Sequence, residues 1–135
     1  MNRITALVLV LGFATWALPV GAHQEHQMSG AKKTAPQSIT GEVVDTGCYL
    51  GHAARGAKHV DCATKCINNG MPMGLLTRDG ALYLLTLNHD NADPYNKLKE
   101  MAGKMVSVTG VVMTRGGMKG VDVSEIKPAT ESASK

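Results

Sequence analysis

Residues 104–126, KMVSVTGVVMTRGGMKGVDVSEI, decide the fold of this chain of 135 residues. Valine alternates with small or polar residues over residues 105–113 and again over residues 121–126. Such alternation is typical of strands that bury one face, so we expect a strand in each run. The glycine-rich stretch between the runs, residues 114–120, predicts a turn. The segment therefore predicts two strands joined by a turn.

A second pair of strands is predicted upstream, in residues 73–87 (MGLLTRDGALYLLTL). Its two apolar runs are separated by Asp79 and Gly80, a pair that suits the two positive-φ positions of a type I′ hairpin turn. Further upstream, residues 39–49 (ITGEVVDTGCY) are rich in β-branched residues and contain two glycines, which predicts a first strand with a bend or bulge. The chain thus has five predicted strands.

Two short helices are expected between these strands. Residues 59–68 contain neither glycine nor proline, and Gly70 suits the position just after a helix end. Asp93 and Pro94 suit the N-cap and the first position of a second helix, which Gly103 can end. The predicted order is strand, short helix, strand, strand, helix, strand, strand.

Five strands with a helix between the third and fourth is the element order of the OB-fold, a small Greek-key barrel. From residue 39 to residue 128 the chain resembles small exported OB-fold domains, and residues 104–126 resemble their last two strands. The resemblance implies a β-rich (α+β) architecture: a five-stranded OB-fold-like barrel, with a short Cys- and His-bearing helix after strand one and a helix between strands three and four. It implies no particular function, because this barrel serves many.

The first 22 residues have the layout of a secretory signal peptide. Arg3 is followed by an apolar run that is shorter than the ~20 residues of a membrane anchor, and small residues up to Ala22 precede a polar stretch. We therefore expect cleavage after Ala22, a periplasmic or secreted protein, and no stable membrane anchor afterwards. Residues 23–38 and 129–135 are polar and are expected to be flexible or disordered tails around a domain of residues 39–128.

The composition argues against nucleic-acid binding. The net charge is only +3, and the basic residues are spread among acidic ones. Without Phe13 and Trp16 of the signal peptide, three tyrosines are the aromatic residues of the mature chain. That is too few for the stacking platforms of OB-folds that bind single strands. No nucleophile elbow, phosphate-binding loop or paired-carboxylate motif indicates an enzyme.

The side chains best suited to a specific function are three cysteines and two histidines. On a helix over residues 59–68, His59, Cys62 and Cys66 are spaced i, i+3 and i+7 and share one face. Cys48 and His52 lie upstream, where a loop with two glycines can fold them over that face. Thiolate and imidazole ligands suit zinc and copper(I), whereas magnesium and calcium prefer oxygen. The sequence therefore predicts a copper or zinc site formed by Cys48, His52, His59, Cys62 and Cys66.

Three cysteines in an exported chain leave two other interpretations open. Two of them can form a structural disulfide while the third stays free, which suits a stapled module that binds an exported protein partner. Alternatively, Cys62 and Cys66 can form a redox pair, although their spacing is C-x3-C and not the C-x2-C of thioredoxin-like proteins.

Cys62, Cys66 and Met73 also resemble the ligand loop of the binuclear CuA copper site. This resemblance adds a hint of copper, because thioethers favour copper(I). Gly70 stands where that loop has its second histidine. The alternative for Met71 and Met73 is that both simply pack against the barrel.

Overall fold

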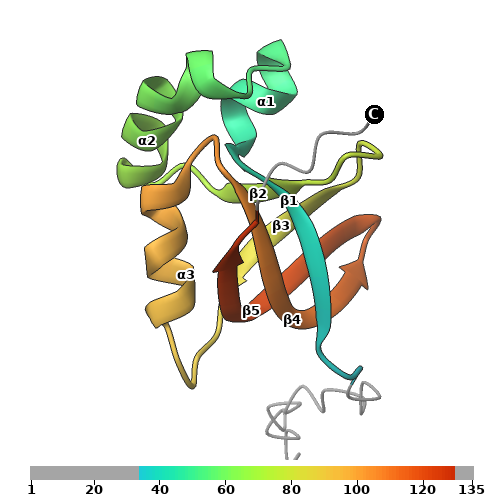
Figure 1. Ribbon diagram of the computed structural model, residues 1–135. Helices are drawn as coiled ribbons and strands as arrows, with labels where there is room; N and C mark the ends of the chain where they lie inside the picture. Colours follow the sequence, from blue (N-terminus) through green and yellow to red (C-terminus); the bar gives the residue numbers. More distant parts are fainter. Residues whose placement is uncertain (1–33, 130–135) are drawn as a thin grey trace, which may run out of the picture. The chain divides into compact units, whose positions relative to one another are not determined.

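The computed structural model describes residues 34–129. They form a five-stranded mixed sheet and three helices, an α+β arrangement with the predicted number of strands (Figure 1). The predicted signal peptide, residues 1–22, lies outside the described residues, as do most residues of the two predicted tails. Within the described part of the chain, no helix is long and apolar enough to cross a membrane.

The strands of the sheet are β1 (Gln37–Asp45), β2 (Met73–Leu76), β3 (Leu82–Leu87), β4 (Met105–Arg115) and β5 (Met118–Pro128). They are hydrogen-bonded in the order β1-β2-β3-β5-β4, and β4 pairs with β1 again, so the sheet is closed. The β3–β5 pair is parallel and the other pairs are antiparallel. Within the described residues every strand therefore has two neighbours, although residues 37–41 of β1, 111–115 of β4 and 124–128 of β5 are paired on one side only.

Three short helices connect the strands: α1 (Thr46–His52), α2 (Val60–Asn68) and α3 (Asp93–Leu98). Both α1 and α2 follow β1, and Figure 1 shows them at the same end of the sheet, whereas α3 connects β3 to η2 and β4 beside the sheet. Single 3-10 turns, η1 (Ala57–His59) and η2 (Lys99–Met101), precede α2 and follow α3. The two predicted helices are thus confirmed, whereas α1 has no counterpart among the predicted elements.

The first strand ends at Asp45 and does not continue through Tyr49 as predicted. Asp45 has extended backbone angles and is the N-cap of α1, where its carboxylate accepts a hydrogen bond from the Cys48 N–H at 2.7 Å. Aspartate is a favoured N-cap because its carboxylate satisfies an N–H of the first turn that has no partner within the helix. The prediction of a strand over residues 46–49 is therefore wrong, and Cys48 lies in a helix.

The turn between β2 and β3 is not the predicted type I′ turn. Gly80 N–H donates to the Thr77 carbonyl oxygen at 3.0 Å, and Thr77 N–H donates to the Ala81 carbonyl oxygen at 2.9 Å. Gly80 has a φ of +86°, but Asp79 is not among the described residues with positive φ. A type I′ turn needs positive φ at both central residues, so this loop has three residues and ends on a left-handed glycine.

Two consecutive positive φ values occur instead between β4 and β5. Gly116 and Gly117 have φ values of +57° and +81° and connect the paired residues Arg115 and Met118. Because this connection is so short, both strands extend further toward the turn than the valine pattern predicts. The hairpin that the C-terminal sequence predicts is confirmed.

The start and end of α3 agree with the prediction to within a residue or two. Ala92 is the N-cap and Asp93 is the first helical residue, so the predicted N-cap role of Asp93 is wrong by one position. Gly103, with a φ of +72°, follows η2 and ends the helical segment as predicted.

The core is aliphatic and includes one face of α2. Ala63 and Ile67 of α2 are 2% and 3% exposed, and Leu98 of α3 is fully buried. Cys62 and Cys66 each precede one of these inward residues, so the two cysteines lie on a neighbouring face of α2 that is less buried. Ala102, which follows η2, is also buried, and the strands supply the other members of the core: Val43, Met73, Leu75, Leu85, Val106, Val108, Val121 and Val123.

Candidate metal centre

The three cysteines of the chain come together at one end of the sheet. Their sulfur atoms all lie within 4.8 Å of one another, although Cys48 comes from α1 and the other two from α2. All three cysteines are free in the structure. Cys48 and Cys66 are half-buried and Cys62 is exposed, so the group, which we call the sulfur cluster, opens to solvent on the Cys62 side.

Helix geometry places two of the three sulfurs next to each other. Cys62 and Cys66 are four residues apart on α2, and side chains at this spacing are neighbours on a helix surface. Ala63 and Ile67 fix the rotation of α2 by facing the core. The core packing of α2 therefore determines where this pair of cysteines points.

A hydrogen-bonded connection holds α1 beside α2. The N–H and the Oγ1 of Thr46, the first residue of α1, each donate to the Pro72 carbonyl oxygen at 3.0 Å. The preceding residue, Met71, donates its N–H to the Cys66 carbonyl oxygen at 2.9 Å. This chain of contacts ties the helix of Cys48 to the end of the helix of Cys62 and Cys66.

A second group of ligand-type side chains shares Cys48 with the sulfur cluster. One ligand atom each of Asp45, Cys48 and His59 lies within 4.8 Å of the other two. Asp45 is fully buried: its Oδ1 accepts from the Cys48 N–H, and its Oδ2 lies 3.1 Å from Nε2 of His59. The His59 side chain is 19% exposed. Cys48 therefore belongs to both groups, and its sulfur lies near the other two sulfurs and also near one imidazole and one carboxylate.

The surroundings raise the pKa values of two of the thiols. Partial burial raises the pKa of Cys48 from 9.0 to about 12, and the hydrogen bond and negative charge of Asp45 and the neighbouring Cys62 add to this effect. The pKa of Cys66 is also raised, first by burial and then by Cys62. Both thiols are therefore protonated at neutral pH in the metal-free protein, and an incoming ion must displace their protons.

Two of the predicted ligands, His52 and His59, lie outside the sulfur cluster. His52 is the last residue of α1 and is exposed, and it belongs to neither group. His59 was expected on one face with Cys62 and Cys66, but it caps α2 and groups with Asp45 and Cys48. Met73 is 1% exposed and packs in the core, as the packing alternative predicts, whereas Met71 is 38% exposed and does not fit that alternative.

Asp45 is the member of the site that sequence reasoning missed. It stands at the end of a run of β-branched residues, where a strand pattern hides its role as an N-cap. An Asp directly before a Thr-Gly-Cys segment that lacks strand alternation is a signal for a helix start, and this signal was available in the sequence.

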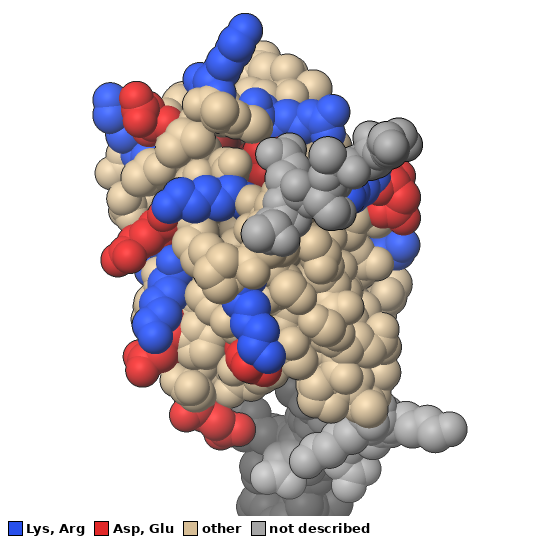
Figure 2. Space-filling model, in the orientation of Figure 1, with Lys and Arg blue, Asp and Glu red and all other residues tan. Residues whose placement is uncertain are grey.

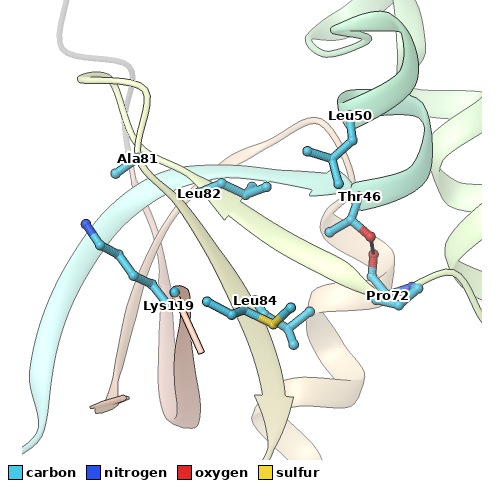
Figure 3. Close-up of a pocket in the computed structure, with 9 residues that line it drawn as sticks. Thr46, Leu50, Pro72, Ala81, Leu82, Leu84 and Lys119 are labelled. Carbon is cyan, nitrogen blue, oxygen red and sulfur yellow. Dashed lines mark hydrogen bonds between the residues drawn. The ribbon is translucent and has the colours of Figure 1, made fainter. Parts of the chain in front are cut away.

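An apolar pocket lies on the other side of α1. Its volume is about 480 Å³. Figure 3 shows Thr46 and Leu50 of α1 on one side of it and Leu82 and Leu84 of β3 on the other. Thr46 and Leu50 are one turn apart, while Cys48 lies between them in sequence and so points to a different face of the helix. The pocket contributes no residue to either ligand group.

On the face in Figure 2, Lys and Arg side chains are interspersed with Asp and Glu side chains, so this face has no continuous area of one sign.

Comparisons of the chain with protein-family models, with curated proteins and with solved structures found no match.

Proposed function

We propose that this chain is an exported metal-binding protein in which Cys48, Cys62 and Cys66 hold one zinc or copper(I) ion. The single observation that carries the proposal is the mutual distance of no more than 4.8 Å among the three sulfurs. A tetrahedral zinc with Zn–S bonds of about 2.3 Å separates its sulfurs by about 3.8 Å. The three side chains thus need only small movements to bind one ion.

The types of donor support a soft or borderline metal. Thiolates select copper(I) and zinc, whereas magnesium and calcium take oxygen ligands. The carboxylate beside the cluster, Asp45, already accepts two hydrogen bonds. Asp61, the acidic residue in the first turn of α2, is exposed and belongs to neither ligand group.

Export supports the same proposal. The signal-peptide pattern of residues 1–22 predicts a periplasmic or secreted location, where thiols are oxidised unless something protects them. A bound ion provides such protection for all three cysteines. A disulfide would account for only two of them.

We also propose that the closed sheet is an OB-fold-type barrel. Its support is the strand order β1-β2-β3-β5-β4 and the position of α3 between β3 and β4. In this account the barrel is the scaffold, and α1 and α2 at one end carry the metal ligands.

Anaerobic titration of the reduced protein with zinc and with copper(I) tests the metal proposal. We expect one ion per chain. Loss of a hydrogen-bonding partner of a metal ligand typically weakens metal binding by roughly 10–100-fold. Removal of a ligand itself should cost more, so we expect a larger loss of affinity in each of the variants Cys48→Ser, Cys62→Ser and Cys66→Ser. His52→Ala is the matched control, since His52 lies on α1 but in neither group. A reduced protein that binds neither ion would refute the proposal.

The same preparation tests the two competing functions. A stapled interaction module predicts one free thiol per chain after denaturation and metal removal, whereas the metal site predicts three. A redox protein predicts that Cys62 and Cys66 exchange reversibly with glutathione over the physiological range of potentials. Three free thiols without such exchange would leave metal binding as the function.

A further inference from the structure

We propose, building on the metal site above, that His59 is its fourth ligand through Nδ1 and that Asp45 is the positioning residue that holds the ring for this role. The site would then be a Cys₃His zinc site. Structural zinc sites have four protein ligands, and three cysteines with one histidine is a common set.

The hydrogen bonds of Asp45 are the first observation behind this proposal. Its Oδ2 lies 3.1 Å from Nε2 of His59, and its Oδ1 accepts the Cys48 N–H at 2.7 Å. A fully buried carboxylate requires such partners to be stable. Both oxygens are therefore committed to positioning two candidate ligands, one in α1 and one at the start of α2.

The same contact decides which ring nitrogen is free. A carboxylate accepts hydrogen bonds, so the neutral His59 ring donates its Nε2–H to Asp45, and Nδ1 carries a lone pair. Histidines that bind metals commonly donate their other N–H to a carboxylate, which fixes the tautomer and makes the ring more basic. The Asp45–His59 pair has this arrangement.

The proximity of both groups to one sulfur is the second observation. Cys48 Sγ belongs to the sulfur cluster and also lies within 4.8 Å of a His59 nitrogen. Among the described residues, Asp45 and His59 are the oxygen and nitrogen ligands that group with a cysteine of the sulfur cluster, and that cysteine is Cys48. His59 is partly exposed and lies in the short η1 segment. It forms a group with Cys48 but not with Cys62 and Cys66, so the proposal requires its ring to move toward an ion held by the three sulfurs.

Asp45→Asn tests the positioning role without removing the helix cap. Asparagine is an equally favoured N-cap, so its Oδ1 can still accept the Cys48 N–H. Its Nδ2 donates, however, and a donor facing Nε2 favours the tautomer with the proton on Nδ1, the atom that must bind zinc. We expect zinc affinity to fall by roughly 10–100-fold and His59→Ala to cost at least as much. Asp61→Asn, an exposed change on α2, should alter nothing.

Substitution of cobalt(II) for zinc gives a visible spectrum that reports the ligands of the metal, and a residue with a merely structural role would not change this spectrum. The wild-type and Asp61→Asn proteins should give the visible spectrum of a four-coordinate S₃N site, and His59→Ala should lose it and regain it with added imidazole. Because Asp45 acts through His59, Asp45→Asn should have no further effect in the His59→Ala background.

The outcomes separate this inference from the proposed function. If the wild-type protein binds neither zinc nor copper(I), the metal site itself is wrong, and if it binds copper(I) but no zinc, only the Cys₃His zinc proposal is refuted. If it binds one zinc through its cysteines, but His59→Ala and Asp45→Asn keep the affinity and the cobalt spectrum, only the Cys₃His proposal is refuted. Should Asp45→Asn not fold, the ring ¹³C and ¹⁵N shifts of His59 in the zinc-bound wild-type protein decide the matter: coordination through Nδ1 supports the proposal, and coordination through Nε2 or none overturns it.

Discussion

Thr46 donates two hydrogen bonds to one acceptor, the carbonyl oxygen of Pro72, from its N–H and its Oγ1, each at 3.0 Å. This contact fixes the start of α1 to the segment that follows α2. The relative position of Cys48 and Cys66 depends on it, because the two cysteines lie in different helices. The metal site is thus assembled by tertiary contacts of the backbone as well as by the spacing of cysteines in the sequence.

Thr46→Val should loosen the site with little change of shape. The substitution keeps the β-branched volume and removes the Oγ1 donor, which we expect to lower the free energy of unfolding by about 0.5–1.5 kcal/mol. Zinc affinity should fall as well, because α1 is held less firmly. Urea unfolding and zinc titration measure both effects, with Thr114→Val on the exposed part of β4 as control. Equal zinc affinity in the two variants would contradict the role of this contact.

Ile67→Ala should weaken both the fold and the metal site. Ile67 is 3% exposed and anchors α2 to the core, so its truncation should cost about 2–5 kcal/mol of stability. Leu98→Ala removes a fully buried leucine from α3 and serves as the control, since α3, unlike α2, carries no residue of either ligand group. Under conditions where both variants stay folded, we expect only Ile67→Ala to lower zinc affinity. A similar loss in both would show that the effect is one of global stability.

The metal-free fold should lose stability at alkaline pH because of Cys48. Its pKa is raised from 9.0 to about 12, first by burial and then by Asp45, so the unfolded chain loses this thiol proton before the folded one does. The contribution is complete below pH 9.0 and disappears as the pH rises toward about 12. Cys48→Ser should therefore lose less stability over this window. Urea unfolding of the metal-free proteins at about pH 8 and about pH 11 checks this, and identical losses would contradict it.

Two glycines should respond very differently to alanine. A Cβ on Gly110, at the bulge of β4, would overlap the Asp122 carbonyl oxygen, which is backbone and cannot move aside. We expect Gly110→Ala to cost about 1–3 kcal/mol or more. On Gly47 of α1 the Cβ would meet Cε and Sδ of Met71 at 2.7 and 2.8 Å, the end of a flexible side chain. Gly47→Ala should be close to neutral, and thermal unfolding of both variants measures the contrast.

Much of the fold follows from local patterns in the sequence. Valine alternation predicts β4 and β5, and a segment without glycine or proline that ends at Gly70 predicts α2. The turn at Gly80 depends on the backbone hydrogen bonds of Thr77, and α1 depends on the hydrogen bond that Asp45 accepts from the Cys48 N–H. Both elements therefore differ from the prediction. Asp45 stops the strand by capping α1, and no periodicity in a segment as short as α1 can show this.

The site is predicted only in part for a similar reason. The chain has three cysteines, so their identification as candidate ligands needs no structure. The pairing of His59 with Asp45, however, depends on the end of β1 meeting the 3-10 turn before α2, a contact between residues 14 apart. His52 has favourable spacing from Cys48, but its position at the exposed end of α1 leaves it outside both groups.

The most direct test of the central claim is to measure metal content and thiol number together on protein purified anaerobically from its own compartment. The account predicts one zinc or copper ion per chain and, after the metal is stripped under denaturing conditions, three free thiols from Cys48, Cys62 and Cys66. Protein that contains no metal and only one free thiol would contradict it, because two of these cysteines would then form a disulfide.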